Sequence, residues 1–254
     1  MPKKFEVRWE GDLPATPAQA WDAFTVHTAG WLWKIHYEPR LGGAETGLTK
    51  GGGAVTAWEP GRHFATRAEA GGGFFNQLDY RLEPRGERTH LKFTHQGVFA
   101  DDEYDSQLDA CRRHTAFYNH SLTEYLRHFA GRDAVYLDLD VPEESAKAGF
   151  AVLRDALGVP ANAAVGDEVR MTPEGMDPID GVVDYATGPF LGVRTPDALY
   201  RFFGRERWGW PVGVALHLYA EGIDEAEAKK AWEEYLRDVY ANDDTLCVDS
   251  RQSQ

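Results

Sequence analysis

The side chains best suited to chemistry in this sequence are its histidines, and eight of the nine lie before residue 130. Such a concentration suggests a metal site, because imidazole nitrogen is a common metal ligand. The spacing does not support one. His90 and His95 are five apart on an expected strand and face opposite sides, while His114 and His120, six apart on an expected helix, do not share a face. We predict no metal site and no cofactor.

The sequence also lacks the motifs of other common chemistries. It contains no GxxxxGK[ST], no GxGxxG after a strand, no HExxH and no GxSxG. Nucleotide hydrolysis by a P-loop, dinucleotide binding, zinc proteolysis and α/β-hydrolase chemistry therefore lack their minimum parts. We assign no catalytic residue, and whether the protein is an enzyme stays open.

What remains is a set of rings and polar side chains suited to lining a cavity, the rings as apolar walls and the polar groups as handles. The predicted ligand-binding residues are Trp33, Trp58, Phe75, Tyr80, Phe93, His95, His114 and Tyr118. The alternative is that each is ordinary core. Two pairs, Asp79 with His95 on neighbouring strands and His114 with Tyr118 one helical turn apart, could carry pKa values suited to acid–base chemistry.

These residues need elements to position them, and the most distinct one is a long helix expected over residues 101–131. Its apolar stripe steps by three and four residues through Tyr104, Leu108, Cys111, Thr115, Tyr118, Leu122, Tyr125 and Phe129. Acidic residues begin the segment, basic residues end it, and Gly131 follows, which fits the helix dipole and a glycine stop. Because the stripe is rich in aromatic and small side chains, we predict that this helix is a lid over a cavity.

The segments before this helix read as a strand, two short helices and a meander. Residues 4–10 alternate as a strand, and Thr16, Pro17 and Gln19 form a capping box that starts a short helix. A second short helix is expected near Gly30. Between residues 36 and 97, short alternating segments separated by glycine and proline turns predict five or six antiparallel strands.

The second half repeats this order in shorter form. A strand at 134–142, a helix at 142–158, a Pro- and Gly-rich loop at 159–178, four strands and a helix at 223–241 follow one another. Two units of the same order suggest a tandem repeat, although two unrelated α+β units are the alternative. The predicted domains are residues 1–132 and 133–242, followed by a polar tail at 243–254.

Charge and composition narrow the classes of partner. The net charge is −14, divided into −1 up to residue 132 (16 basic, 17 acidic) and −13 from residue 133 on (11 basic, 24 acidic). This balance argues against nucleic acid and against an anionic membrane, and the acidic residues of the second half are expected to be a solvated face. Cys111 and Cys247 lie outside any CxxC motif, and no apolar run nears the length of a membrane span. We expect a cytoplasmic protein, monomeric or homodimeric.

Several segments together resemble a known family. ATPAQAWDAF, GGGAVTAWEPGRHF and FNQLDYRLEPRGERTHLKFTHQGVF, followed by the long helix, are similar to the activator-of-Hsp90-ATPase-like (AHSA1-like) branch of the START/Bet v 1 (SRPBCC) superfamily. GPFLGVRTPDALYRFFGRERWGWPVGVALHLY resembles the degenerate second domain of bacterial two-domain members. The resemblance implies an α+β helix-grip fold present twice, with a curved antiparallel sheet around a long C-terminal helix and a cavity for a small hydrophobic molecule.

Since one fold serves many functions, two hypotheses follow. The first is a binding module for a small hydrophobic or aromatic molecule. The second is a cyclase- or aromatase-type enzyme that acts on a polyketide-like substrate by general acid–base chemistry.

Overall fold

The computed structural model describes residues 2–100 and 102–241, and the chain forms two compact units, residues 1–134 and 135–254. Each unit is described by itself. Cys247 and the predicted polar tail at 243–254 lie outside the described residues.

The first unit contains a seven-stranded antiparallel sheet. Its strands are β1 (Lys3–Leu13), β2 (His36–Tyr37), β3 (Ala44–Thr46), β4 (Gly53–Glu59), β5 (His63–Glu69), β6 (Phe75–Arg85) and β7 (Arg88–Phe99). The order β1-β7-β6-β5-β4-β3-β2 is a meander whose last long strand pairs with the first strand of the chain. The predicted meander of five or six strands is confirmed. β3 was not expected, because three residues are too few to show alternation.

The helices of the first unit follow the predicted order, with differences in length. α1 (Pro17–Thr25) has the predicted capping box, in which the Thr16 side chain accepts from the backbone of Gln19 and the Gln19 side chain accepts from the backbone of Thr16. The expected second short helix is a single 3₁₀ turn, η1 (Thr28–Gly30), and a further 3₁₀ turn, η2, spans Gly71–Gly73. The long helix α2 (Tyr104–His128) is shorter at both ends than the predicted 101–131.

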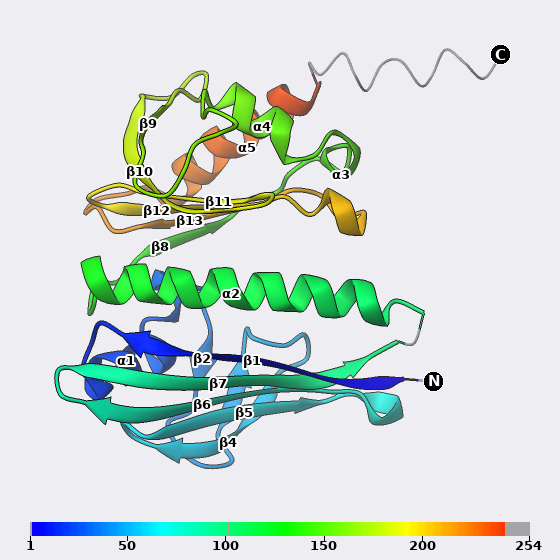
Figure 1. The fold of residues 1–254 in the computed structure, drawn as a ribbon, viewed down its shortest axis with the longest axis vertical. Helices are drawn as coiled ribbons and strands as arrows, with labels where there is room; N and C mark the ends of the chain where they lie inside the picture. The colour runs from blue at the N-terminus through cyan, green and yellow to red at the C-terminus, as the bar shows by residue number, and fades with distance from the viewer. Residues whose placement is uncertain (1, 101, 242–254) are drawn as a thin grey trace. The chain divides into compact units, whose positions relative to one another are not determined.

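Helix α2 lies along one face of the sheet, as Figure 1 shows. From its predicted stripe, Thr115, Leu122, Tyr125 and Phe129 are buried. The ring of Tyr125 fits only because residue 30 has no side chain, since a Cβ at Gly30 would lie 2.5 Å from the Tyr125 ring. This close approach packs α2 against η1, the turn that follows α1.

The second unit has the same order of elements around a six-stranded antiparallel sheet. Its elements are β8 (Val135–Asp138), α3 (Ser145–Ala148), α4 (Phe150–Ala156), β9 (Glu168–Met171), β10 (Ile179–Thr187), β11 (Phe190–Arg194), β12 (Ala198–Phe203), η3 (Glu206–Trp208), β13 (Gly213–Leu218) and α5 (Glu225–Ala241). The strand order β8-β13-β12-β11-β10-β9 again pairs the first strand with the last. Helices α4 and α5 lie on one face of this sheet (Figure 1).

Two expectations for the second unit are corrected. The helix predicted over 142–158 is broken into α3 and α4 at Gly149, whose φ of 79° no helix continues. The predicted loop at 159–178 contains β9, a four-residue strand that pairs with β10. The last helix begins with a side-chain cap, because Asp224 Oδ1 accepts from the backbone N–H of Glu227 at 3.0 Å.

A buried charged pair lies in the interior of the second unit. Arg201 on β12 donates from Nη1 to both carboxylate oxygens of Asp184 at 2.9 and 3.0 Å, and their side chains are 1% and 5% exposed. Gly192 on the strand between them makes the room, since a Cβ there would lie 2.2 Å from Asp184 Oδ1 and 2.6 Å from Arg201 Nη1. The pair is therefore built into the sheet rather than added to its surface.

The strand orders define the fold class of both units. Each has a meandering antiparallel sheet, a first strand paired with the last strand, and a terminal helix packed on the sheet. The predicted α+β helix-grip, repeated with a degenerate second copy, is confirmed, and the sheet of the second unit has six strands where that of the first has seven. Among the described residues, no helix combines the length and the apolar character needed to cross a bilayer.

Candidate functional site

A chain of polar contacts lies between the sheet of the first unit and helix α2. His95 on β7 is the centre: its Nδ1 is 3.2 Å from Cys111 Sγ on α2, and its Nε2 is 2.6 Å from Asn76 Oδ1 on β6. Asn76 Nδ2 donates to Thr49 Oγ1 at 3.2 Å, and the backbone N–H of Thr49 donates to Glu45 Oε1 at 3.3 Å. Four elements and one loop thus contribute to a single polar path.

The hydrogen bonds fix which ring nitrogen of His95 carries its proton. Because Asn76 donates with its amide nitrogen to Thr49, its Oδ1 is the atom that faces His95 and must accept. His95 therefore donates from Nε2–H, and the neutral ring leaves Nδ1 to accept from the thiol of Cys111. Both ring nitrogens of His95 are therefore paired.

Burial sets the protonation of these groups. It lowers the pKa of His95 to about 4 and raises the pKa of the Cys111 thiol to about 11, so both are uncharged at neutral pH. Burial also raises the pKa of the Tyr80 hydroxyl far above neutrality. His95, Cys111 and Asn76 are therefore neutral donors and acceptors rather than an ion pair or a thiolate nucleophile.

An aromatic group stands beside this polar path. The rings of Trp33 and Tyr118 meet edge to face with centroids 5.7 Å apart, and the rings of Tyr118 and His114 are 6.0 Å apart. All three side chains are half-buried, as are His95, Asn76 and Cys111. Trp33 is held by its indole N–H, which donates to the carbonyl of Gly47 at 2.8 Å. The predicted pair of His114 and Tyr118 is therefore present, next to a third predicted residue, Trp33.

Three other predicted residues lie toward α1 among closely packed rings. Tyr80 is 4.9 Å from Phe93 and 4.6 Å from Phe24 between centroids, and Trp58 is 4.9 Å from Trp21. Tyr80 and Phe93 are 5% and 7% exposed. Their contacts are those of a packed core, and a ligand-binding role for Trp58, Tyr80 and Phe93 stays a prediction.

Phe75 lies apart from the other seven. Neighbouring residues of a strand point to opposite faces, and Asn76 points to the inner face, so Phe75 points to the outer face of the sheet. There the Arg67 guanidinium stacks 3.9 Å from the centroid of the Phe75 ring. With Lys4, Glu6 and Gln96 among its neighbours, it lines a shallow hollow of about 540 Å³. Phe75 therefore does not share a site with His95.

The predicted pair of Asp79 and His95 is wrong. Asp79 sits opposite Thr94 in the β6–β7 register, one residue out of step with His95, so the two side chains lie on opposite faces. On the outer face Asp79 accepts from His63 Nε2 at 2.9 Å and pairs with Arg81 at 3.1 Å.

Four members of the polar path were not predicted as site residues: Glu45, Thr49, Asn76 and Cys111. A signal existed for two of them. Asn76 alternates with Leu78 and Tyr80 on one face of β6, and Cys111 belongs to the stripe of α2, so both were due to face the interior. Glu45 and Thr49 lie in and after the short strand β3, where no periodicity marks them.

No group of three or more His, Cys, Asp or Glu side chains within residues 2–100 and 102–241 could hold a metal ion.

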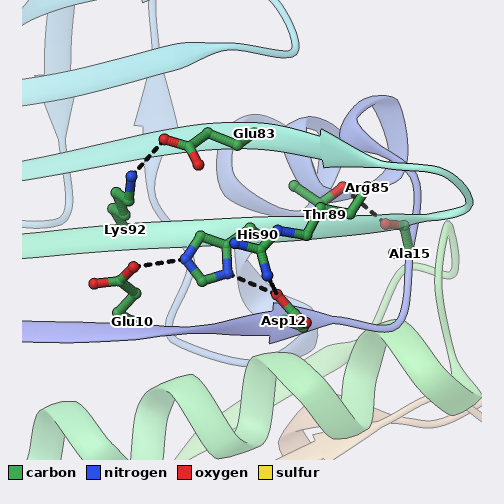
Figure 2. A network of polar contacts seen from close by, with 8 residues as sticks. All are labelled: Glu10, Asp12, Ala15, Glu83, Arg85, Thr89, His90 and Lys92. Atoms are coloured by element: carbon green, nitrogen blue, oxygen red, sulfur yellow. Dashed lines mark hydrogen bonds and ion pairs between the residues drawn. The ribbon is translucent and has the colours of Figure 1, made fainter.

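A second polar cluster surrounds His90, on the opposite face of β7 from His95, as the five-residue spacing predicted. Figure 2 shows its two ring nitrogens between carboxylates of β1, with Nε2 2.7 Å from Glu10 Oε1 and Nδ1 2.6 Å from Asp12 Oδ1. Arg85 pairs with the same Asp12 oxygen at 3.2 Å. Both nitrogens face acceptors, so the charged imidazolium is the form that this cluster binds.

We expect His90 to titrate above its ordinary value. The hydrogen bond to Glu10 and then that to Asp12 raise the pKa of His90 above 6.5. A raised folded-state pKa stabilises the fold fully below the unfolded value of about 6.5, and this stability is lost as the pH rises through the folded value. The check is an NMR titration of the His90 ring, with Glu10→Gln as the variant that shifts the midpoint downward. A midpoint at or below that of an unfolded histidine would contradict the cluster's geometry.

Comparisons with known proteins found solved structures that are similar to about half of this chain. No protein-family model matches the sequence, and no curated protein matches it. Among solved structures, MLL2253 from Mesorhizobium loti is 18% identical, covering 49% of this chain and 98% of its own, with a TM-score of 0.43. CalU16 from Micromonospora echinospora is 18% identical over 48% of this chain and 74% of its own, with a TM-score of 0.40. The Aha1 dimer from Colwellia psychrerythraea is 18% identical over 48% and 96%, with a TM-score of 0.39.

Proposed function

We propose that the first unit binds a small aromatic or hydrophobic molecule. The proposed site consists of the rings of Trp33, Tyr118 and His114 together with the polar path around His95. The observation that supports this most is the half-buried state of these side chains, close along α2 to the contacts of His95 with Asn76 and Cys111. Rings offer apolar contact, and the neutral imidazole and amide offer oriented hydrogen bonds, which is the usual composition of a small-molecule site. The helix-grip fold supports membership of the START/Bet v 1 superfamily. As part of the same proposal, the chain is a tandem two-domain member of the AHSA1-like branch.

The chemistry of the site favours binding over the cyclase or aromatase alternative. A general acid or base works best with a pKa near the working pH. His95, with a pKa of about 4, is too weak a base at neutral pH, and Cys111, with a pKa of about 11, is too weak an acid. A ligand would therefore meet fixed neutral dipoles rather than a group poised to move protons.

The test has two parts, both on the full chain. Native mass spectrometry of protein purified from its own host is expected to show a retained small molecule. Titration with 1-naphthol, followed by its fluorescence, is expected to show saturable binding that Trp33→Leu and His95→Ala each weaken roughly tenfold, the loss of about 1.4 kcal/mol.

Phe75→Leu is the matched control, because Phe75 is an aromatic residue of the same unit that lies on the outer face. It is expected to leave 1-naphthol affinity unchanged. Equal weakening by Phe75→Leu and Trp33→Leu would show that the probe binds elsewhere. If no molecule is retained and no saturable binding occurs, the proposed function is wrong.

A further inference from the structure

A hollow in the second unit has the charge and the unused polar group of a binding site. It measures about 530 Å³ and lies between α5, the end of α4 and the turn around Gly175. Its carboxylates are Glu174, Glu234 and Asp238, and its apolar walls are Ala156, Met176, Ala231 and Val239. Volumes of this size are typical of sites for small molecules.

Tyr235 gives the second, independent observation. Its side chain lines the hollow and is 5% exposed, and its hydroxyl has no hydrogen-bond partner among the described residues. Leaving a buried hydroxyl unpaired costs free energy, about 1–3 kcal/mol, that a bound partner would recover. The ring itself is fixed by edge-to-face packing against Trp232, with centroids 6.0 Å apart, so the hydroxyl cannot easily turn out to solvent.

The charges around this hydroxyl are poorly compensated. Glu234 has one distant cation, Lys230 Nζ at 3.8 Å. Within the part of the chain that the structure describes, neither Glu174 nor Asp238 forms an ion pair. Burial and then the charge of Glu174 raise the pKa of Tyr235 to about 12, so the hydroxyl remains protonated. Its oxygen keeps an acceptor position that no donor among the described residues fills.

We propose that this hollow binds a small organic cation that carries a primary ammonium group on a short hydrocarbon chain. An ammonium group has three N–H donors, and Tyr235, Glu174 and Asp238 supply acceptors for them. The carboxylates offset the positive charge, and the alanine, methionine and valine side chains cover the hydrocarbon. An anionic ligand would face three carboxylates, and a purely apolar one would leave the Tyr235 hydroxyl unpaired.

The experiment titrates the full chain with n-butylammonium chloride at low ionic strength, followed by NMR or calorimetry. Saturable binding is expected, and butan-1-ol, which has the same hydrocarbon without the charge, should bind at least about tenfold more weakly. Tyr235→Phe keeps the packed ring and is expected to weaken binding about three- to tenfold, while Glu174→Gln with Asp238→Asn should weaken it more than tenfold.

Glu227→Gln is the matched control, because Glu227 lies on the same helix, is exposed and does not line the hollow. It should leave the affinity unchanged. A parallel titration with N-acetyl-lysine methylamide separates a free amine from a lysine side chain as the source of the ammonium group. Equal affinity for butan-1-ol and n-butylammonium, equal effects of Glu174→Gln and Glu227→Gln, or no saturable binding would each overturn the proposal. None of these outcomes tests the proposed function of the first unit, which has its own probe and variants.

Discussion

Replacing Arg201 with methionine should lower the free energy of unfolding of the second unit by about 3–5 kcal/mol, the usual result of removing one partner from a buried ion pair. The guanidinium holds both oxygens of Asp184 at 2.9 and 3.0 Å, and both side chains are almost completely buried. Methionine fills much of the same volume but leaves the Asp184 carboxylate in the interior without this cation. The loss would therefore come from the remaining charge more than from lost packing.

Hydrogen exchange on the full chain measures this effect unit by unit. Peptides from β11 and β12 should lose protection in Arg201→Met, while peptides from β6 and β7 report on the first unit in the same sample. Arg170→Met is the control, because Arg170 pairs with Asp180 at 3.5 Å across two strands of the same sheet with both side chains exposed. Its cost should be at most about 1 kcal/mol.

A double variant separates charge from volume. Arg201→Met with Asp184→Leu removes both charges and should regain most of the lost stability, since apolar replacements of buried pairs are often neutral. If Arg201→Met proved no more costly than Arg170→Met, the buried pair would not stabilise the second unit as its geometry indicates.

Acid should weaken the first unit through His95, by about 2–3 kcal/mol between pH 7.5 and pH 4.5. Burial lowers the pKa of His95 from 6.5 to about 4. The unfolded chain therefore takes up a proton near pH 6.5, whereas the folded one does so only near pH 4. Stability from the neutral ring is fully present above the unfolded value and is lost as the pH falls toward the folded one.

The measurement is the free energy of unfolding from urea titration, with hydrogen exchange of β7 peptides to assign it to the first unit. His95→Gln keeps a donor and an acceptor of similar reach but does not titrate, so it should lose less stability on acidification than the wild type. His90→Gln is the internal control on the same strand and should change the dependence in the opposite direction. If the wild type and His95→Gln responded equally to acid, His95 would not be held neutral by burial.

These two histidines show how far local pattern predicts the site. Alternation placed His90 and His95 on opposite faces of one strand, and the structure confirms it. The predicted pairing of Asp79 with His95 failed because the register between β6 and β7, which the turn between them sets, was not considered. In this register Asp79 lies opposite Thr94, and alternation then puts Asp79 on the face away from His95. Neighbouring strands bring two side chains together only when their residues are in phase.

The sequence by itself determined the order of the longer elements, the capping box of α1, the inward stripe of α2 and the two-fold repetition of strand, short helices, meander and helix, but it missed the short strands β3 and β9. Periodicity and capping are local, so they can be read from adjacent residues. The tertiary structure alone decided that Cys111 and Asn76 complete the hydrogen bonds of His95, that Gly30 makes room for Tyr125, and that Gly192 makes room for a buried Arg201–Asp184 pair. Those contacts join residues far apart in the chain, and burial, which sets the pKa values of the site, exists only once the elements have packed.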